Sequence, residues 1–382
     1  MKKKITVFTG SRADYGILRP LIMRLKNDKQ VNLAIVAGSH HFSKVFGFTY
    51  KEILRDKNKI NYTSPVKINK TSFEEVIKYC GKSMIHFSNY LKKNKPDLII
   101  LLGDRYEVFS FCVASFFFNI PIAHIHGGEL TEGAFDDSLR HAITKLSDYH
   151  FVSHNKYKKR VIQLGENPKN VFNVGAMGIE NILRDNLISK YNLFKKYNIP
   201  RNLKKILVTF HPETKDRFNI KKQIDILLSA LLSIKGIFYI FTYSNSDPFG
   251  KHFIKKAINF SNKYKNSILF KSMGSKIYHS FLKSSDLIIG NSSSGIIEAP
   301  SLKIPTLNIG NRQKGRIFPK SVIQCANNKR IIAQNIKKML KNNKKINLKN
   351  PYYKKNTSLE IFLKIKKILK KKYKNKIFYD VL

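Results

Sequence analysis

Acid and base side chains follow directly after two apolar runs of this chain. The run at 98–102 is followed by Asp104, and the run at 120–125 is followed by His126 and, three residues later, Glu129. Imidazole and carboxylate groups held in place by a scaffold are common general acids and bases. Two glycines separate His126 from Glu129 and would let the backbone approach a ligand. This spacing predicts a site for proton transfer.

A third carboxylate, Asp136, opens the stretch 136–147, whose pattern predicts a helix. Asp136 or its neighbour Asp137 is therefore also explained as a cap of that helix. A cap does not explain why His126 and Glu129 meet in the same turn. We therefore favour the acid/base interpretation for this region.

Neighbouring polar residues have structural explanations. The stretch 103–107 places Asp104, Arg105 and Glu107 at the end of a strand, where acid and base could form a structural ion pair. His124 lies within an apolar run. We therefore expect His124 to be a core histidine.

Two turns have the composition of phosphate sites. Residues 9–16 (TGSRADYG) form a turn of small residues that leads into a predicted helix and contains Arg12. Residues 291–295 (NSSSG) follow the apolar run 287–290 and precede a second predicted helix. Hydroxyl groups, glycine and helix N–H groups together bind phosphate well. A surface turn and a serine-rich helix cap are the structural alternatives.

The second turn predicts a diphosphate site with further groups around it. The residues that we assign to this cradle are Ser292, Ser293, Gly295 and Glu298. Glu298 is expected one turn into the helix, where its carboxylate would suit a ribose diol. His211 follows the apolar run 206–210, and Arg312 lies in a second cationic turn at 308–316.

Several motifs of cofactor and metal sites are absent from the sequence. It contains no GxGxxG, no GxxxxGK[ST] and no GxSxG motif, and no HExxH or clustered ligand spacing. We therefore expect no cofactor and no metal. The pattern fits a nucleotide-activated small molecule bound between anion cradles and acid/base groups.

The chain is strongly basic, with a formal net charge of +46 over 382 residues. Such a balance suggests polyanionic partners. Only 13 of the 71 basic residues are arginines, although readers of nucleic-acid grooves rely on arginine. The lysines are spread along the whole chain. We therefore expect neither a nucleic-acid partner nor a membrane partner.

Short β-branched runs recur between longer helical stretches, which indicates βαβ units and parallel sheets. The runs lie at 5–9, 33–37, 98–102, 120–125, 149–153, 171–175, 206–210, 237–242, 267–270, 287–290 and 305–309. The pattern restarts after a lysine-rich stretch near 180–204. We predict an α/β protein with two Rossmann-like domains, at 1–185 and 186–355, and a C-terminal helical segment at 356–382.

The sequence favours a soluble, cytoplasmic protein. Cys80, Cys112 and Cys325 are isolated, which fits a reducing compartment. The apolar segment 108–125 is divided by Asn119 and Pro121, so it predicts a buried helix followed by a buried strand rather than a membrane span. The N-terminal apolar stretch is too short for a signal peptide.

The segment 359–376 places Leu359, Ile361, Phe362 and Ile365 at helical spacing, with lysines on the other face. A helix lying on a membrane surface would look similar. We favour a terminal helix that docks by its apolar stripe.

At these residues the chain resembles the hydrolysing UDP-N-acetylglucosamine 2-epimerases of bacterial sialic-acid biosynthesis. The matching stretches span nearly the whole chain in order: TGSRADYGIL (9–18), LGDRYEVFS (102–110), AHIHGGE (123–129), GAFDDSLRHAITKLS (133–147), KKRVIQLGENP (158–168), FHPET (210–214), GNSSSGIIEAPSL (290–302) and NIGNRQKGR (308–316). The resemblance implies a glycosyltransferase-B-like fold with substrate between two Rossmann domains and a C-terminal helix crossing back to the first.

The resemblance also implies a reaction. The proton on the second sugar carbon is removed with anti elimination of UDP, and water adds to the resulting glycal to release N-acetylmannosamine. Asp104 and Asp136 match acid/base positions and His126 a third, where relatives can carry glutamate. Glu129 is a secondary candidate, and His211 matches a histidine that contacts phosphate or the departing group.

The resemblance further implies a set of binding residues. Arg12, Ser292, Ser293 and Arg312 would hold the diphosphate, Glu298 would hold the ribose, and Arg105 and Asn245 would add weaker contacts. The expected partners are a UDP-sugar substrate and further copies of the chain, in a dimer or tetramer.

Other functions remain open from the sequence. A related hydrolase acting on UDP-2,4-diacetamido-2,4,6-trideoxyglucose in legionaminic-acid biosynthesis would share the fold and mechanism. The HIHGGE and GNSSSG sequences resemble those of the hydrolysing branch more than those of the non-hydrolysing epimerases. A retaining glycosyltransferase would need an acceptor. A lysine-rich nucleic-acid or membrane binder would ignore UDP-sugars and lose affinity steeply with salt.

Overall fold

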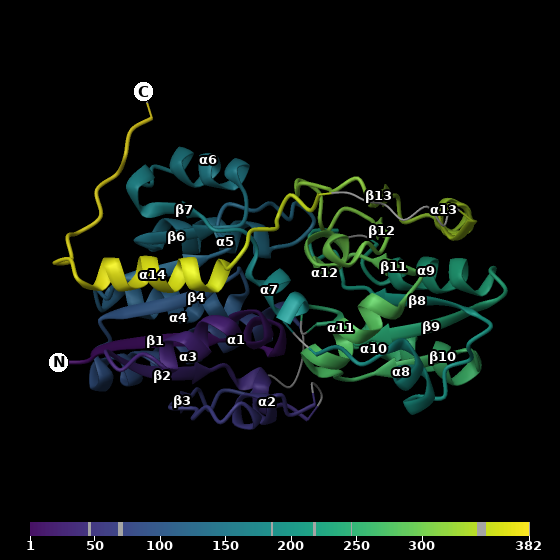
Figure 1. Ribbon diagram of the computed structural model, residues 1–382, viewed down its shortest axis with the longest axis horizontal. Coiled ribbons are helices and arrows are strands. Elements are labelled where there is room, and N and C mark those ends of the chain that lie inside the picture. The colour runs from purple at the N-terminus through teal and green to yellow at the C-terminus, as the bar shows by residue number, and fades with distance from the viewer. Residues whose placement is uncertain are drawn as a thin grey trace. The chain divides into compact units, whose positions relative to one another are not determined.

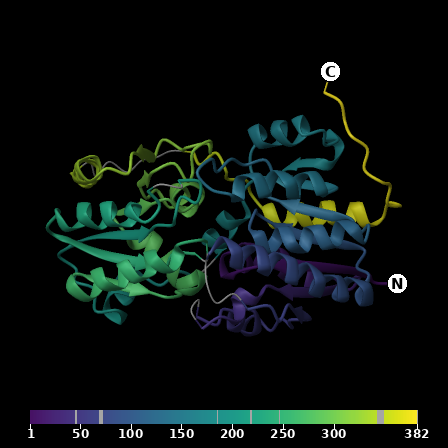
Figure 2. The same cartoon turned by 180° about the vertical axis from the view of Figure 1, so that it is seen from behind.

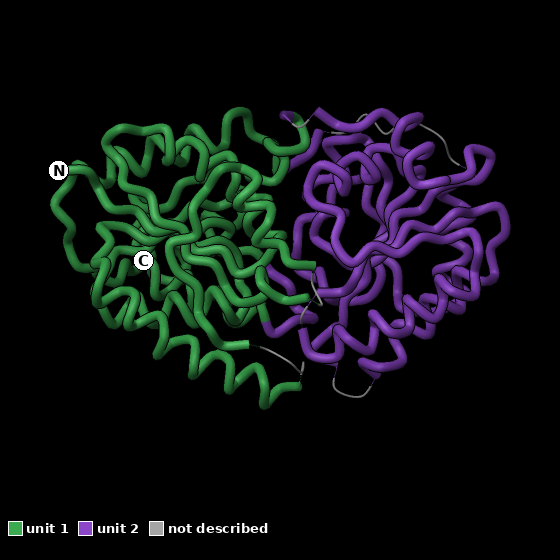
Figure 3. Tube along the Cα trace, turned by 90° about the horizontal axis from the view of Figure 1, so that it is seen from below, with its two compact units in different colours: residues 1–129, 136–183, 352–382 green, residues 130–135, 184–351 purple. Residues whose placement is uncertain are grey.

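The computed structural model divides the chain into two compact units, which are coloured separately in Figure 3. The first unit comprises residues 1–129, 136–183 and 352–382, and the second comprises 130–135 and 184–351. The structure describes residues 1–44, 47–67, 72–184, 186–216, 219–245, 247–341 and 349–381. The chain therefore crosses between the units four times, and the C-terminal segment belongs to the first unit.

The first unit is built on a seven-stranded parallel sheet in the order β3-β2-β1-β4-β5-β6-β7 (Figure 1). Its strands are β1 (Lys3–Thr9), β2 (Val31–Ala37), β3 (Tyr62–Thr63), β4 (Leu98–Leu102), β5 (Ile122–Ile125), β6 (Tyr149–Val152) and β7 (Val171–Asn173). This is the Rossmann strand order with one strand added. The order reverses between β1 and β4, so the turns after these two strands lie side by side.

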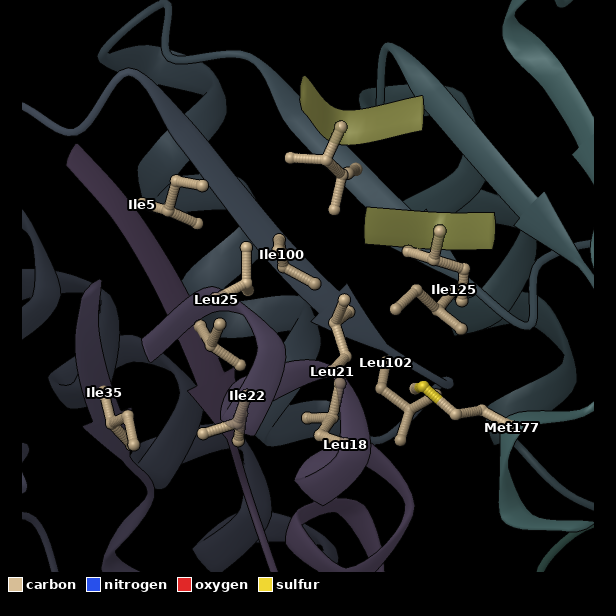
Figure 4. Close-up of a cluster of buried hydrophobic side chains, with 14 of the residues drawn as sticks. Ile5, Leu18, Leu21, Ile22, Leu25, Ile35, Ile100, Leu102, Ile125 and Met177 are labelled. Atoms are coloured by element: carbon tan, nitrogen blue, oxygen red, sulfur yellow. The ribbon is translucent and has the colours of Figure 1, made fainter. Parts of the chain in front are cut away.

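Two layers of helices cover the first sheet. Successive side chains of each strand point to opposite faces of the sheet, so every strand contributes to the packing of both layers. On one face, Ile5 and Ile100 join α1 (Arg12–Lys26), α7 (Met177–Arg184) and α14 (Thr357–Leu369) in one core (Figure 4). On the other, Phe8 and Ile99 pack against α3 (Phe73–Asn94), α4 (Tyr106–Phe117) and α5 (Asp136–Leu146). The helices α2 (Tyr50–Arg55) and α6 (Asn155–Gln163) complete the unit.

The C-terminal helix α14 docks on α1 through its apolar stripe, as expected from the sequence (Figure 1). Ile361 and Ile365 are fully buried. The first turn is fixed by Glu180 of α7, which accepts hydrogen bonds from the backbone N–H and the hydroxyl of Ser358 at 2.7 and 2.8 Å. The apolar residues of α14 thus attach this helix to α1 of the first unit.

The second unit holds a six-stranded parallel sheet in the order β10-β9-β8-β11-β12-β13, which is again the Rossmann order. Its strands are β8 (Lys204–Thr209), β9 (Ile237–Thr242), β10 (Ser267–Phe270), β11 (Leu287–Gly290), β12 (Thr306–Ile309) and β13 (Val322–Cys325). Its helices are α8 (Lys190–Lys196), α9 (Lys222–Leu232), α10 (Gly250–Lys263), α11 (Gly274–Ser284), α12 (Ser294–Ile297) and α13 (Lys329–Lys341). The predicted α/β class with two Rossmann-like sheets is confirmed.

The structure differs from the sequence-based expectation in local details. β3 has two residues and β13 lies at the sheet edge with two exposed side chains, so neither shows the apolar signal of a buried strand. The expected helix and strand within 108–125 both form, but Phe116, Phe117 and Phe118 at the end of α4 are exposed. Among the described residues, no helix is long and apolar enough to cross a membrane.

Candidate active site

The carboxyl edge of the first sheet gathers the acid and base residues that the sequence singled out. Asp104 and Arg105 follow β4, His126 follows β5, and Ser153 follows β6. Ligands of open α/β sheets bind at this edge, where the strand order reverses. The neighbouring side chains decide which of these groups are oriented for chemistry.

Asp104 is held by a buried arginine of α5. The Arg140 guanidinium donates a hydrogen bond to the Asp104 carboxylate and another, at 2.7 Å, to the backbone carbonyl of Glu129. The Arg140 side chain is 2% exposed, whereas that of Asp104 is 20% exposed. A charged donor in a dry environment fixes its acceptor strongly. The buried Arg140 therefore fixes the orientation of the Asp104 carboxylate, part of which remains exposed to solvent.

His126 and Glu129 form a second group with a third residue behind them. The Nδ1 atom of His126 lies 3.4 Å from Oε1 of Glu129, and the Ser153 hydroxyl donates to the same oxygen at 2.6 Å. A base oriented by a carboxylate, itself held by a further donor, is a frequent catalytic arrangement. His126 also has a positive φ of 67°. Such strain in a non-glycine residue clusters at functional sites.

Packing within the first unit requires both glycines of this turn, which the sequence-based interpretation did not foresee. A Cβ on Gly127 would lie 2.8 Å from the Thr144 hydroxyl, and one on Gly128 would lie 2.7 Å from the carbonyl oxygen of Tyr157. Gly128 also has a φ of +74°. The turn is thus pressed against α5 and α6, which fixes the position of His126.

His124 lies in the core, as expected. It is fully buried, and its ring nitrogens contact the Thr144 hydroxyl at 3.1 Å and the carbonyl oxygen of Gly103 at 2.7 Å. Burial lowers the pKa of His124 to about 3. It is neutral at physiological pH and braces the turn that carries Asp104.

Arg105 pairs with Glu107 rather than with Asp104. Its Nε and Nη2 atoms donate to the Glu107 carboxylate at 3.2 and 3.0 Å, and His40 Nδ1 lies 3.0 Å from the same group. Burial raises the pKa of Glu107, but Arg105 and His40 outweigh it and lower that pKa to about 2. The fully buried Glu107 carboxylate therefore stays ionised and orients Arg105.

The other two expected residues of the first unit lie at helix starts. Arg12 begins α1 and is half-buried, and Asp136 begins α5 and is buried. Within the same turn as Arg12, Asp14 accepts hydrogen bonds from the N–H and hydroxyl of Ser11 at 2.8 and 3.0 Å. Burial raises the pKa of Asp14 to about 6.

In the second unit, His211 and Asn291 join the turns after β8 and β11. The His211 N–H donates to the Asn291 side-chain oxygen, and the Asn291 amide donates to the His211 carbonyl, both at 2.8 Å. The backbone N–H of Asn245 donates to His211 Nδ1 at 3.1 Å. A neutral His211 therefore carries its proton on Nε2 and can donate from there.

Arg312 and Asn245 converge on the same turn. Arg312 donates to the carbonyl oxygen of Asn291 at 3.3 Å and lies 3.5 Å from the Asp247 carboxylate. The Asn245 amide donates to Asp247 at 2.5 Å. The structure thus brings three of the predicted residues of the second unit together, namely His211, Asn245 and Arg312. Asp247 contacts both Arg312 and Asn245, and the sequence analysis assigned it no role.

The serine-rich turn differs from the expectation in the position of Glu298 and in the role of Gly295. The helix α12 ends at Ile297 after four residues, so Glu298 lies just beyond it and not within it. The Ser294 hydroxyl donates to the Glu298 carboxylate. Gly295 is required for packing, because its Cβ would lie 2.6 Å from Thr306 Cγ2. Ser292 and Ser293 directly precede this short helix and are half-buried.

Other functional residues escaped the sequence-based analysis for identifiable reasons. Arg140 lies within the matching stretch 133–147 and Ser153 directly follows β6, but the sequence analysis assigned neither a role. His40 follows β2 as Asp104 follows β4, so applying the strand-end rule to every run would have found it. Among the described residues, no group of three or more His, Cys, Asp or Glu side chains could hold a metal ion.

Comparisons with known proteins agree over most of the chain. The family model described as UDP-N-acetylglucosamine 2-epimerase matches residues 23–366. The chain is 40% identical over 386 residues to polysialic acid biosynthesis protein P7 of Escherichia coli, covering 99% of this chain and 98% of that protein. It is 40% identical over 323 residues to a GDP/UDP-N,N'-diacetylbacillosamine 2-epimerase (hydrolyzing) of Campylobacter jejuni, covering 84% of each.

The fold is also similar to a solved structure. The crystal structure of UDP-GlcNAc 2-epimerase from Neisseria meningitidis bound to UDP-GlcNAc superimposes with a TM-score of 0.80 at 19% identity. The match covers 97% of this chain and 100% of that one.

Proposed function

The chain belongs to the UDP-N-acetylglucosamine 2-epimerase family, and from this premise we propose that it is a hydrolysing member. It converts UDP-N-acetylglucosamine and water to N-acetylmannosamine and UDP, for the synthesis of sialic-acid-type sugars. The observation that carries the proposal is the acid/base set at the carboxyl edge of the first sheet, with Asp104 held by a buried arginine.

The reaction has two steps. A base removes the proton from the second sugar carbon, a double bond forms between the first and second carbons, and UDP leaves with the electron pair of the carbon–oxygen bond. Water then adds its hydroxyl to the first carbon of the glycal. A proton adds to the second carbon on the face opposite to the one from which the first proton was removed, which inverts that carbon. The barrier is highest where a weakly acidic carbon loses its proton while a diphosphate departs.

The first unit supplies the proton-transfer groups. Asp104, at the end of β4 and oriented by Arg140, and Asp136, at the start of α5, are the acid/base pair. His126 is a third proton-transfer group, with Glu129 behind it at 3.4 Å. Arg12 and Arg105 add positive charge for the diphosphate.

The second unit holds the nucleotide. Ser292, Ser293 and Arg312 bind the diphosphate, and Glu298 accepts hydrogen bonds from the ribose diol. His211 donates from Nε2 to the phosphate of the departing UDP, since its Nδ1 already accepts the N–H of Asn245. Asn245 is a weaker contact to the same group.

A second candidate substrate is UDP-2,4-diacetamido-2,4,6-trideoxyglucose. The similarity to the Campylobacter jejuni protein, whose name specifies a diacetylated bacillosamine, favours it. The mechanism and residue roles would be unchanged, because the second acetamido group and the methyl lie away from the carbons that react.

Proton NMR of the purified enzyme in heavy water tests both substrates. With UDP-N-acetylglucosamine, we expect UDP and N-acetylmannosamine carrying deuterium on the second carbon. Turnover of the diacetamido analogue alone would change the substrate and keep the mechanism. No turnover of either would refute the proposed function.

The variant Asp104→Asn separates catalysis from binding. We expect turnover to fall by about 10³-fold, since a positioned acid/base group contributes roughly 10²–10⁴. UDP affinity, measured by calorimetry, should change little because Asp104 is assigned to proton transfer and not to nucleotide binding. The control Asp225→Asn alters an exposed carboxylate of α9 and should leave both unchanged. A lysine-driven polyanion binder would show no response to Asp104→Asn.

A further inference from the structure

A short segment between Glu129 and Asp136 belongs to the second unit, although both of these residues belong to the first. It comprises residues 130–135, which Figure 3 colours with the second unit. All six residues are described by the structure, and they form neither helix nor strand. Thr131 and Ala134 are nevertheless only 4% and 1% exposed. Contacts with the rest of the second unit must therefore hold the segment in place.

The segment 130–135 is hydrogen-bonded to the turn after β8 of the second unit, which Figure 2 shows from behind, mainly in green. The N–H of Phe135 donates to the Thr214 hydroxyl at 3.0 Å, and the N–H of Lys215 donates to the carbonyl oxygen of Gly133 at 3.2 Å. Thr214 is 2% exposed, so its hydroxyl is an acceptor in a dry environment. The same turn carries His211, which we assign to the departing UDP.

The segment 130–135 also packs on the turn after β12. The N–H of Glu132 donates to the carbonyl oxygen of Lys314 at 3.1 Å. A Cβ on Gly133 would lie 2.7 Å from the carbonyl oxygen of Asn311 and 2.8 Å from the Cα of Arg312. Only glycine allows so close an approach. The segment therefore lies against the backbone of Arg312, which we assign to the diphosphate.

The two turns that hold the segment are also joined to each other. Glu213, in the turn after β8, accepts the N–H of Asn311, in the turn after β12, at 2.9 Å. Because the segment is bonded to both turns, a nucleotide that shifts or fixes them also shifts or fixes Phe135. Asp136 follows Phe135 directly in the chain. The position of the nucleotide-binding turns is thus transmitted to the first residue of α5.

We propose that Thr214 is a positioning residue for Asp136. Its hydroxyl holds the N–H of the residue that immediately precedes Asp136, so the nucleotide-binding turns set the place of this carboxylate. Asp136 is buried and begins α5, and its position therefore follows the backbone at the helix start. The inference rests on the proposed function, which assigns proton transfer to Asp136. A misplacement of about 1 Å can lower a rate roughly 10²-fold.

Steady-state turnover of Thr214→Val tests this assignment. Valine keeps the shape of threonine but cannot accept the N–H of Phe135. We expect kcat to fall by about tenfold or more, because Asp136 is no longer held in place. The Kd for UDP, measured by calorimetry, should change by less than about twofold, since only the catalytic step loses an interaction. Thr214→Ser keeps the hydroxyl and should restore kcat.

Ser285→Ala is the matched control for Thr214→Val. The Ser285 hydroxyl is also buried and donates to the carbonyl oxygen of Phe281 at 2.7 Å, but it precedes β11, at the amino edge of the second sheet. Each variant loses one buried hydroxyl hydrogen bond, so thermal unfolding should show similar small losses of stability. Only Thr214→Val should lose kcat. An equal fall of kcat in both variants would overturn the proposal.

Gly133→Ala tests the contact from within the segment. The added Cβ must push the segment away from Asn311 and Arg312, so we expect kcat and UDP affinity to fall together. Glu132→Gln removes only an exposed ion pair with Lys314 at 3.2 Å and should change neither. Wild-type kcat in Gly133→Ala would contradict transmission through the segment.

Hydrogen exchange measures the positioning without turnover. In wild type, saturating UDP should slow exchange across 130–136 by about threefold or more, because the turns that hold the segment are fixed. Thr214→Val should lose most of this protection, and a wild type without it would overturn the proposal. A wild type that turns over neither UDP-sugar would refute the proposed function and this assignment with it. An active wild type with an equally active Thr214→Val would overturn the assignment alone.

Discussion

At the scale of single residues, the orientation of the Asp104 carboxylate depends on one arginine. Arg140 is nearly fully buried and contacts both the Asp104 carboxylate and the Glu129 carbonyl. Its charge is tolerated because an acid and a backbone oxygen satisfy it. Arg140 is thus a positioning residue for the proposed base, and it couples the turns after β4 and β5.

We expect Arg140→Met to lower kcat by about 10²-fold or more, because Asp104 loses its orientation. Removing one partner of a buried ion pair should also cost roughly 3 kcal/mol of the free energy of unfolding. Turnover and urea unfolding measure the two effects. The control Arg19→Met disrupts a half-exposed pair with Asp56 and should leave kcat unchanged. Wild-type turnover in Arg140→Met would show that Asp104 needs no such support.

Gly310 provides a test at the edge of the second sheet where we propose that the nucleotide binds. Its φ is +78°, and a Cβ would lie 1.7 Å from Glu213 Oε1, which accepts the N–H of Asn311 at 2.9 Å. Gly310→Ala should therefore displace Glu213, lower the free energy of unfolding by more than about 2 kcal/mol and weaken UDP binding.

Gly236→Ala is the matched control for Gly310→Ala. Its φ is +76°, but a Cβ there meets nothing within 4 Å. It therefore carries the backbone strain alone, about 1 kcal/mol, and should not alter UDP affinity. Equal losses of stability in the two variants would mean that the contact with Glu213 is unimportant.

At the scale of elements, two buried histidines make the first sheet sensitive to acid. His41, after β2, and His124, in β5, both have a pKa of about 3, chiefly because burial disfavours the charged ring. Unfolded histidine takes up a proton near pH 6.5. Below that pH the unfolded state binds more protons than the folded state, so stability falls as the pH drops from 6.5 towards 3.

Each histidine should contribute a slope of about 1.4 kcal/mol per pH unit in this window. Urea unfolding at pH 7, 5.5 and 4.5 measures the slope, and His124→Gln should flatten it even if the variant is less stable throughout. Asp14, with its pKa raised to about 6, opposes the effect because the folded state favours its protonated form. A slope unaffected by His124→Gln would assign the acid sensitivity to other groups.

The C-terminal helix offers a comparison within one element. Ile361 of α14 is fully buried against α1, whereas Leu363 on the same helix is half exposed. Ile361→Ala should cost about 2–5 kcal/mol of the free energy of unfolding, as buried truncations do. Leu363→Ala should cost less than about 0.5 kcal/mol. Thermal and urea unfolding compare the two, and equal small losses would mean that α14 does not stabilise the unit.

At the scale of the whole molecule, the net charge of +46 should influence encounter with an anionic substrate. Salt screens interactions beyond about 8 Å at physiological ionic strength. We expect kcat/KM for the UDP-sugar to fall between 50 and 500 mM salt (about tenfold) while kcat changes little. Inhibition by uridine, which carries no phosphate, is the control and should be insensitive to salt. A salt-independent kcat/KM would show that the excess charge lies too far from the site to matter.

Local patterns in the sequence were sufficient for the architecture. Each of the eleven apolar runs became a strand. Nine of them lie inside a sheet, where burial on both faces favours a continuous apolar segment. The same rule placed Asp104, His126 and His211 at strand ends. The stripe of α14 predicted its docking because helical periodicity is local. β3 has only two residues and β13 has two exposed side chains, so neither appears as an apolar run.

Tertiary structure alone decided how the site residues are oriented. Asp104 and Arg140 lie 36 residues apart, and Glu213 and Asn311 lie 98 apart. Arg105 pairs with Glu107 instead of its neighbour Asp104, and the glycines at 127 and 128 serve packing. Periodicity reports only whether a side chain is buried. Which partner it meets there is set by the order of strands in the sheet, and this order joins segments that are distant in sequence.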